Sequence, residues 1–351
     1  MPHAGRVVAA ALALALAPVL TRQGAPPPPL LPRDVLRDED LTGATQLGLP
    51  DPIPGIANDE HALALLELGR RLFFDPILSA DRTVSCASCH PPEHAFASPE
   101  KLPRGVGGRT CARNAPTLLN RALGTAQFFD GRAADLVAQV VMPIENHDEM
   151  ATTVDEVVGR LAKSDEYRAL FAAAGAAEPD RATLAAALAE FVRRLLVGDS
   201  PIDRFRAAKG DLTAAERRGL WLFESKAHCW RCHAGPNFSD EQFHDTGIGA
   251  VDGRPEPGRA AFTHDEADRG RFKTPTLRMV ARTAPYMHDG SLATLTDVVQ
   301  YYRRGGNPND HLDPKLEPLD LADDDVAALV ALLEALSRRA DEPGSESRPP
   351  R

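Results

Sequence analysis

Two pentapeptides are the most informative part of this sequence: Cys86-Ala-Ser-Cys89-His90 and Cys229-Trp-Arg-Cys232-His233. They share the form Cys-x-x-Cys-His, and together they contain four of the five cysteines in a chain of 351 residues. From this composition the chance expectation of even one such pentapeptide is about two in a thousand. Two copies are therefore not accidental, and they indicate a chemistry that the chain uses twice.

The spacing within each pentapeptide is typical of covalent haem attachment. Cysteines three positions apart lie on one face of a helical turn, so their sulfurs can bond both vinyl groups of one haem. The histidine that follows then offers its imidazole to the iron as the proximal ligand. The sequence therefore predicts two covalently bound haem c groups, one held by Cys86, Cys89 and His90 and the other by Cys229, Cys232 and His233.

Two other interpretations of the cysteine pairs fit less well. Pooling both pairs into one four-cysteine zinc site leaves the identical histidine in the two pentapeptides unexplained. A thioredoxin-like redox motif would occur once and within a βαβ unit, whereas this chain shows no succession of alternating strand patterns.

The N-terminus carries the pattern of an export signal. Arg6 precedes an apolar run from Val7 to Leu20, which is shorter than the roughly 20 residues that a spanning helix needs. We expect residues 1–24 to be a cleaved signal peptide and the mature protein to be periplasmic, without stable membrane insertion; an uncleaved anchor is the alternative. The net charge of −10 is spread along the sequence and argues against nucleic acid as a partner.

Helical patterns lead into both pentapeptides, which suggests a duplicated domain. A proline-rich, extended lead-in at residues 25–57 precedes a helix that starts at Asn58 or Asp59 and ends near Phe74. Thr213 and Glu216 form a capping-box signature that opens a second helix through Phe223. The predicted fold is mostly α, with two cytochrome c-like haem domains packed together. The predicted ranges are 58–205 for the N-terminal haem domain, 206–340 for the C-terminal haem domain and 341–351 for a disordered tail, with the junction near 198–211.

Five longer stretches carry a family resemblance. They are LGRRLFFDPILSADRTVSCASCH (68–90), RNAPTLLN (113–120), QFFDGRAADL (127–136), FKTPTLRMVARTAPYMHDGSLATL (272–295) and YYRRGGNP (301–308). Together they resemble the bacterial di-haem cytochrome c peroxidase and MauG family over roughly residues 60 to 340. The resemblance implies an enzyme that reduces hydrogen peroxide to water with electrons from a small redox protein, either a cytochrome c or a cupredoxin.

In that family the N-terminal haem is the peroxidatic one, and a glutamine and a glutamate lie on its distal side. The resemblance places these two residues at Gln139 and Glu149. Cleaving the O–O bond requires moving a proton from one peroxide oxygen to the other, which a carboxylate can do, while Gln139 would hold the peroxide by hydrogen bonds. Without the resemblance, both would pass for surface polar residues. Glu145 is the neighbour most easily confused with Glu149.

Many relatives also carry a switch histidine that ligates the peroxidatic iron in the resting enzyme. Between His90 and Phe129 this chain offers only His94. Four residues span at most about 14 Å, which makes a route around the haem to its opposite face improbable. We therefore expect the haem of His90 to be open in the resting enzyme, as in MauG.

The second haem is expected to transfer electrons, and its sixth ligand separates the branches of the family. The cytochrome c peroxidases have an axial methionine where MauG has a tyrosine, and the equivalent residue here is Tyr302. A phenolate stabilises ferric iron, so this haem should have a low potential. Met279 and Met287 are the competing ligands, and Tyr302 could instead be a packed aromatic residue beside Tyr301.

The resemblance also implies a calcium site between the haems, formed by the Asn114 side chain and the backbone carbonyls of Thr283 and Pro285. Hard oxygen donors suit calcium, although Asn114 could equally be an ordinary turn residue. In one departure, Phe129 replaces the family's tryptophan between the haems and is much harder to oxidise.

Three other residues stand near the haem motifs in the sequence. We expect Trp221 to lie in the core, because it falls within a helical pattern, whereas Trp230 could be a surface port for electrons. The leftover Cys111 has no assigned role.

Two alternative functions remain beside peroxide reduction. A MauG-like oxidase would use peroxide to modify a partner protein; Tyr302 and the missing switch histidine favour it, and Phe129 counts against it. A non-catalytic di-haem electron carrier would have six-coordinate irons at both haems and would not react with peroxide.

Overall fold

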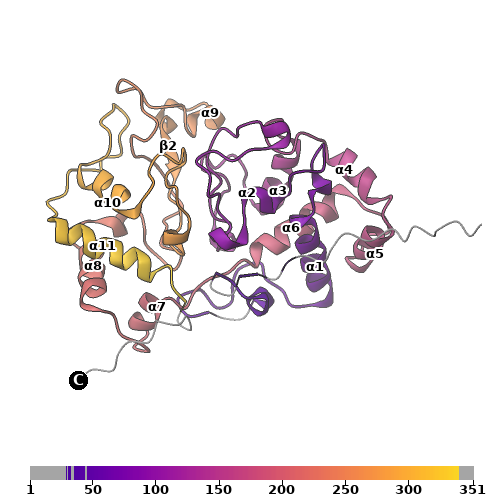
Figure 1. Cartoon of the computed structure of the whole chain (residues 1–351), viewed down its shortest axis with the longest axis horizontal. Helices are drawn as coiled ribbons and strands as arrows, with labels where there is room; N and C mark the ends of the chain where they lie inside the picture. Colours follow the sequence, from indigo (N-terminus) through magenta and orange to yellow (C-terminus); the bar gives the residue numbers. More distant parts are fainter. Residues whose placement is uncertain (1–28, 30, 33–34, 44–45, 340–351) are drawn as a thin grey trace, which may run out of the picture.

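The computed structural model describes residues 29, 31–32, 35–43 and 46–339, so the predicted signal peptide and C-terminal tail lie outside the described residues. The chain forms two lobes that lie side by side (Figure 1), with α1 to α6 in one lobe and α8 to α11 in the other. The expectation of a mostly α fold is confirmed. The only strands in the described ranges, β1 (Phe243–Asp245) and β2 (Arg271–Lys273), pair antiparallel with Phe243 opposite Lys273.

The helices are short, and loops connect them. The first lobe contains α1 (Glu60–Phe74), α2 (Cys86–Cys89), α3 (Leu136–Glu145), α4 (Val154–Leu161), α5 (Asp165–Ala173) and α6 (Arg181–Arg193). The second part of the chain forms α7 (Pro201–Arg206), α8 (Ala214–Glu224), α9 (Ala260–Thr263), α10 (Leu295–Arg303) and α11 (Asp323–Ala335). Short 3₁₀ turns are η1 (Asp38–Thr42), η2 (Pro76–Leu78), η3 (Pro92–His94), η4 (Val106–Gly108), η5 (Arg121–Leu123), η6 (Cys229–Arg231), η7 (Glu266–Asp268) and η8 (Val280–Arg282).

The two helices that precede the pentapeptides start where the sequence predicts. Asp59 caps α1 by accepting a hydrogen bond from the backbone N–H of Ala62 at 2.8 Å. Thr213 caps α8, and its own backbone N–H donates to the Glu216 carboxylate at 2.8 Å. Each cap satisfies backbone donors that would otherwise have no partner at the helix start.

Each lobe has its own hydrophobic core, built around one close helix crossing. In the first lobe α1 crosses α6 at Gly69, where a Cβ atom would overlap the carbonyl oxygen of Ala187. In the second lobe α8 crosses α11 at Gly219, where a Cβ atom would overlap the carbonyl oxygen of Ala328. In both lobes, therefore, the helix that leads into the pentapeptide packs by a glycine against the last helix of its core.

The described part of the lead-in contacts both lobes. Arg194 at the end of α6 is fully buried and donates to the carbonyl oxygens of Leu41 and Ala57. In the second lobe, Arg278 is ion-paired with Asp203 at 2.7 Å and also donates to the carbonyl oxygen of Gly48 at 3.0 Å. The lead-in thus acts as a strap that fixes the lobes to each other.

The boundary between the two lobes lies near α7. Ile202 of α7 already belongs to the second core, and the predicted domain limits of 58–205 and 206–340 stay a prediction.

The expectation that Trp221 is buried is wrong: its side chain is 60% exposed, because Leu220, Leu222 and Phe223 form the inner face of α8. Among the described residues, no helix has the length and apolar character needed to cross a membrane.

Candidate haem sites

The two pentapeptide histidines are held in the same way. The Nδ1 atom of His90 lies 2.9 Å from the carbonyl oxygen of Phe96, and that of His233 lies 2.9 Å from the carbonyl oxygen of Phe238. An Nδ1–H that donates to a carbonyl fixes the tautomer and leaves the Nε2 lone pair for a metal. Burial also lowers the pKa of both rings, which favours the neutral, ligating form.

The four pentapeptide cysteines fit thioether bonds to haem. All four are free and half-buried, and burial raises the pKa values of Cys86, Cys89 and Cys229 to about 12. Two thiols on one helical turn next to a neutral histidine are the set of groups that covalent haem attachment requires. Within the described part of the chain, the four cysteines form no joint cluster, which excludes the four-cysteine zinc site.

The loops that follow the two histidines repeat each other, and from Thr117 and Thr276 onward the equivalent residues keep one constant spacing. Thr117 donates to the carbonyl oxygen of Ala95 at 2.6 Å, and Thr276 donates to that of Asn237 at 2.7 Å. Isolated antiparallel bridges then pair Gln127 with Ala133 and Tyr286 with Leu292, and the N-caps of α3 and α10 are Asp135 and Thr294. The same spacing aligns Phe129 with His288 and Pro143 with Tyr302.

In the first lobe Glu149 lies beside the pentapeptide. After α3 ends, the loop at 146–150 brings the half-buried Glu149 close enough to Cys86 and Cys89 to raise the pKa values of their thiols. Asn146 Nδ2 donates to Glu149 Oε1 at 2.6 Å. Burial raises the pKa of Glu149, while Arg132 and Asn146 act in the opposite direction.

The other two polar residues of this segment occupy different environments. Gln139 lies half-buried on α3, one turn before Pro143. Glu145, at the end of α3, is exposed and pairs with Arg181 at 2.8 Å, and this hydrogen bond lowers its pKa. The structure therefore separates Glu145 from Glu149, a distinction that spacing alone could not make.

His94 lies on the histidine side of the first site. It ends η3, and the loop that follows supplies the Phe96 carbonyl oxygen to the His90 ring. The segment carrying His94 thus packs beside the His90 ring, and the expectation that His94 is not a switch ligand stays a prediction.

In the second lobe the two adjacent tyrosines differ. Tyr301 is 1% exposed, and its hydroxyl donates to the Thr246 carbonyl oxygen at 2.6 Å. Tyr302 is half-buried on α10, and burial together with Tyr301, Cys232 and Cys229 raises its pKa, which places its phenol near the second pentapeptide. The competing Met279 is 1% exposed and belongs to the core of the first lobe.

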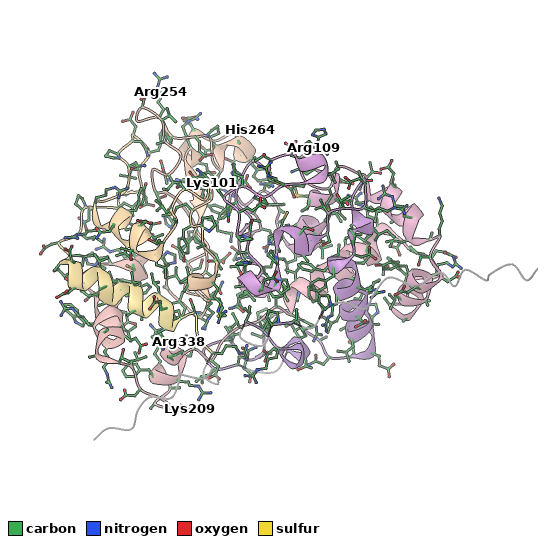
Figure 2. All side chains as sticks on the ribbon, in the orientation of Figure 1. Lys101, Arg109, Lys209, Arg254, His264 and Arg338 are labelled. Carbon is green, nitrogen blue, oxygen red and sulfur yellow. The ribbon has the colours of Figure 1, made fainter. Side chains whose placement is uncertain are left out.

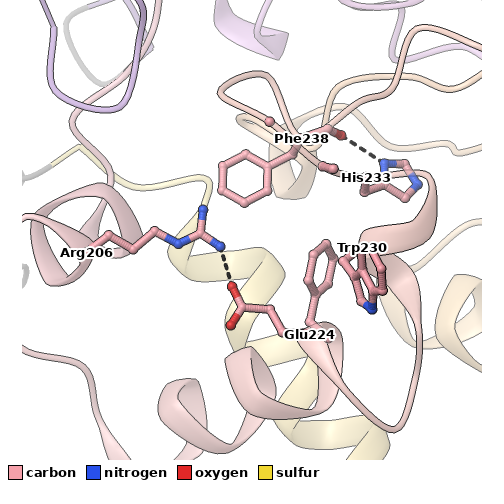
Figure 3. Close-up of a pocket in the computed structure, with 8 residues that line it drawn as sticks. Arg206, Glu224, Trp230, His233 and Phe238 are labelled. Carbon is pink, nitrogen blue, oxygen red and sulfur yellow. Dashed lines mark hydrogen bonds and ion pairs between the residues drawn. The ribbon is translucent and has the colours of Figure 1, made fainter.

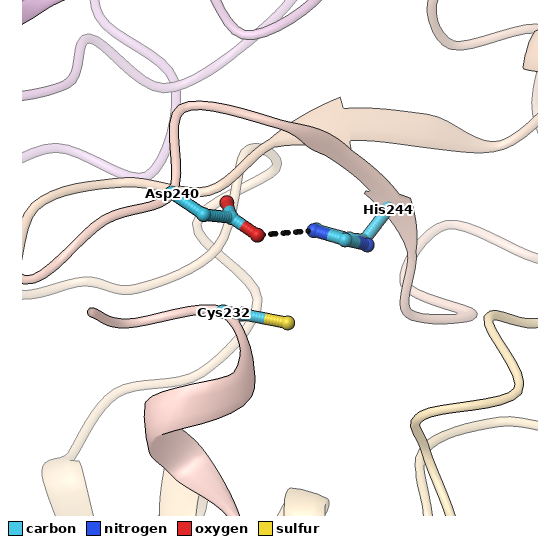
Figure 4. Close-up of side chains that lie close together, drawn as sticks. All are labelled: Cys232, Asp240 and His244. Carbon is cyan, nitrogen blue, oxygen red and sulfur yellow. Dashed lines mark hydrogen bonds and ion pairs between the residues drawn. The ribbon is translucent and has the colours of Figure 1, made fainter.

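The surroundings of Cys232 contain a tightly held histidine. His244 Nδ1 lies 2.6 Å from Asp313, and its Nε2 lies 3.0 Å from Asp240, with the Cys232 sulfur alongside (Figure 4). Burial alone would lower the pKa of His244, but contacts with Cys232, Asp313 and Asp240 outweigh it and raise the pKa to about 9. Once its sulfur is bonded to haem, Cys232 no longer offers a thiolate, so this trio fits a brace for the haem-attachment turn better than a metal site.

A cavity of about 260 Å³ adjoins the second histidine (Figure 3). Its lining includes His233, Phe238 and Trp230, and Arg206 and Glu224 form an ion pair of 2.5 Å at its edge. The Trp230 side chain is 48% exposed. An aromatic ring between the two attachment cysteines therefore reaches solvent.

The lobes meet at a buried group of charges between the two sites. Arg121 of the first lobe forms two hydrogen bonds of 3.0 Å with Glu241 of the second, and Lys273 lies 3.4 Å from the same carboxylate. Burial lowers the pKa of Lys273 to about 8. Because removing one partner would leave a buried charge unpaired, this group fixes the arrangement of the lobes.

Asn114, whose side chain is expected to bind calcium, lies at the same junction. The Asn114 backbone N–H donates to the carbonyl oxygen of His288 at 2.9 Å, and its Nδ2 donates to that of Glu100. No donor from the described residues bonds to Asn114 Oδ1 or to the carbonyl oxygens of Thr283 and Pro285. Phe129 also lies here, with its ring centroid 6.3 Å from that of His288.

Sequence reasoning missed the residues that surround Glu149. Asn146 follows α3 and bonds the carboxylate, and the loop at 103–111 contacts the backbone of residues 147–149. The spacing of an asparagine three residues before a glutamate could have suggested the first contact. Nothing in the local sequence indicates the second, because it joins segments some forty residues apart.

Comparisons with known proteins agree with this geometry. A family model described as di-haem cytochrome c peroxidase matches residues 64–211. The methylamine utilization protein MauG of Methylorubrum extorquens is 40% identical over 294 residues, which cover 82% of each chain. The cytochrome c551 peroxidase of Nitrosomonas europaea is 35% identical over 255 residues, covering 71% of this chain and 75% of that one. The crystal structure of a MauG-like protein associated with microbial copper homeostasis superposes with a TM-score of 0.74 and 32% identity, covering 84% of this chain and 93% of that one.

Proposed function

The chain belongs to the di-haem cytochrome c peroxidase family, and we propose that Glu149 and Gln139 carry the acid–base step of its reaction. The protein is an oxidoreductase with two haem c groups and hydrogen peroxide as its electron acceptor. Pentapeptides with two free thiols and a histidine whose Nε2 is available fit those groups. When bound, the haems supply the redox chemistry: they pass the two electrons that turn one peroxide and two protons into two water molecules.

The observation that carries the proposal is the placement of Glu149. Its half-buried carboxylate is held by Asn146 beside the first pentapeptide, whereas Glu145 is bound outward by Arg181. As a carboxylate, Glu149 accepts a proton from one peroxide oxygen and returns it to the other, which leaves as water. Gln139 on α3 orients the peroxide through its side-chain amide. Because burial raises the pKa of Glu149, its two protonation states lie closer in free energy at neutral pH, as proton transfer in both directions requires.

Replacing Glu149 tests this role. Glu149→Gln keeps the size of the side chain but removes the proton acceptor, so peroxide turnover should fall by about 10²- to 10⁴-fold while both haems remain. Glu145→Gln is the matched control and should change turnover by no more than about twofold, because an exposed ion pair contributes little. Wild-type turnover in a fully haem-loaded Glu149→Gln protein would remove Glu149 from the mechanism.

The second haem is proposed to receive electrons and to have Tyr302 as its sixth ligand. The position of Tyr302 near Cys229 and Cys232 supports this assignment, and so does the core position of Met279. Electrons would come from a small redox protein, a cytochrome c or a cupredoxin, and the exposed Trp230 ring offers one route to the haem edge.

The same tyrosine favours a second candidate function, a MauG-like oxidase that modifies a partner protein. The 40% identity to a methylamine utilization protein supports it as well. Phe129 argues against it, because phenylalanine does not relay oxidising equivalents as tryptophan does. Supplying an electron donor separates the two functions: a peroxidase turns over peroxide continuously, whereas the oxidase needs its protein substrate to return to the resting state.

Two further proposals concern calcium and location. Asn114 Oδ1 and the carbonyl oxygens of Thr283 and Pro285 are hard donors that would hold one calcium ion. Elemental analysis should find about one calcium per chain, which Asn114→Ala should lose. The signal pattern of residues 1–24 supports export to the periplasm, and the mass of the mature N-terminus checks the cleavage.

A further inference from the structure

The loop that carries Glu149 closes on itself through one asparagine. Asn146 Nδ2 donates to Glu149 Oε1 at 2.6 Å, and Asn146 Oδ1 accepts a hydrogen bond from the backbone N–H of Asp148 at 3.0 Å. The backbone carbonyl of Asn146 also accepts from the Glu149 N–H at 3.1 Å. One side chain therefore fixes both the path of the loop and the direction of the carboxylate.

A separate hairpin holds the same loop from outside. The hairpin at 103–111 is closed by the antiparallel bridge between Arg104 and Thr110. It donates hydrogen bonds to three successive carbonyl oxygens: Arg109 Nε to His147 at 2.7 Å, Cys111 Sγ to Asp148 at 3.6 Å and Val106 N to Glu149 at 2.8 Å. Figure 2 shows Arg109 at the outer surface of the first lobe.

The approach of hairpin and loop is as close as it can be. At Gly105 a Cβ atom would overlap the carbonyl oxygens of both Asp148 and Glu149. Any side chain larger than hydrogen at Gly105 therefore has to push the Glu149 loop away, without touching the carboxylate itself.

We propose that Asn146 and the 103–111 hairpin are positioning elements for peroxide reduction, which hold the Glu149 carboxylate where it can exchange a proton with peroxide. The proposal rests on the proposed acid–base role of Glu149. It also gives the leftover Cys111 a function: its thiol donates one of the three hydrogen bonds that hold the loop. Neither Asn146 nor the hairpin takes part in the proton transfer.

The charged groups around Glu149 set its pKa, and this pKa should determine how peroxide turnover depends on pH. Arg132 favours the carboxylate and Asp148 opposes it, while Cys86, Cys89 and Cys111 are neutral thiols or thioethers near it. The Asn146 hydrogen bond also favours the carboxylate. Because the carboxylate is the form that accepts the proton, activity should fall as the pH drops through the pKa of Glu149.

The test compares three haem-loaded variants of the full chain with peroxide as substrate. Asn146→Ala should lower kcat/KM by about 10-fold or more, since hydrogen bonds to charged groups are strong, and should move the acid limb of its pH profile to higher pH. Gly105→Ala should lower kcat/KM by displacing the loop. Gly159→Ala is the control, because Gly159 lies on α4 with no atom within 4 Å of an added Cβ, and it should leave the rate and the pH profile unchanged.

The outcomes separate this inference from the function on which it rests. If Asn146→Ala and Gly105→Ala keep the wild-type rate and pH profile while Glu149→Gln is impaired, the positioning role is wrong and the acid–base role stands. If Glu149→Gln keeps wild-type turnover, the acid–base role itself fails. If Gly105→Ala does not fold or loses haem, the pH profile of Asn146→Ala decides alone: an unshifted acid limb overturns the inference.

Discussion

The two lobes of this protein share one arrangement of helices and loops, and they differ at an aligned position in the helix beside each haem motif. In both, a glycine-mediated helix crossing supports the pentapeptide, a backbone carbonyl holds the histidine Nδ1, and a helix with a capped start follows the same kind of turn. The aligned residues within those helices are Pro143 in α3 and Tyr302 in α10. A duplicated scaffold can thus house two different haem environments.

The two helices end at nearly equivalent positions, α3 two residues after Pro143 and α10 one residue after Tyr302, so the lobes differ in the side chain at the aligned position and in the path of the chain that follows α3. Pro143 lies within the last turn of α3, and the chain then leaves the helix and folds back, with the N–H of Met150 donating to the Pro143 carbonyl oxygen at 3.2 Å. This return brings Glu149 to the first pentapeptide. In α10 the aligned residue is Tyr302, whose phenol lies near Cys229 and Cys232. The first lobe therefore offers a proton acceptor, and the second offers a phenol.

The largest expected effect is the loss of a single haem from either lobe. Thioether bonds survive unfolding, so denatured wild-type protein should carry two haems. Replacing Cys86 and Cys89 by alanine should leave one haem and abolish peroxide turnover. Replacing Cys229 and Cys232 should also leave one haem but should impair mainly the supply of electrons. Mass spectrometry of the denatured chain gives the count, and zinc in place of covalent haem would contradict the whole assignment.

The next effect distinguishes the two tyrosines of α10. Tyr302→Phe should remove one low-spin ferric signal, and Tyr302→Met should raise the potential of the second haem, because a thioether stabilises ferrous iron better than a phenolate does. Tyr301→Phe is the control: it loses the hydrogen bonds of the hydroxyl with the Thr246 carbonyl oxygen and the Asn307 backbone N–H, and it should keep both the signal and the potential. If the Tyr302→Phe protein keeps the wild-type spectrum and potential, Tyr302 is not a ligand, and Met287 becomes the candidate to replace next.

The smallest expected effect concerns the arrangement of helices that the lobes share. Gly69→Ala and Gly219→Ala each force two helices apart and should cost about 1–3 kcal/mol of unfolding free energy. The exposed Gly159→Ala should instead gain about 0.5–1 kcal/mol from helix propensity. Chemical denaturation measures all three. Similar losses of unfolding free energy in Gly69→Ala and Gly219→Ala would show that the two helix crossings stabilise their lobes equally. A loss in only one variant would show that they do not.

What the sequence could predict depends on how local the signal is. The starts of α1 and α8 follow from Asp59 and Thr213, because helix caps are read within four residues. Glu149 and Tyr302 came from a family resemblance, since no periodicity distinguishes them from Glu145 or Tyr301. The helical pattern wrongly predicts a buried Trp221, because the buried face of α8 consists of its neighbours Leu220, Leu222 and Phe223. The contact of Gly105 with the Glu149 loop depends on tertiary structure, which a local pattern does not report.

The electronic spectrum of the resting ferric protein, before and after peroxide is added, tests the central claim most directly. If the His90 haem is open and Tyr302 closes the His233 haem, the spectrum should contain one high-spin and one low-spin iron. Peroxide should then react without any earlier reduction, because no switch ligand has to leave. Two low-spin irons, and no reaction with peroxide until the protein is half-reduced, would contradict the claim that the two lobes differ in this way.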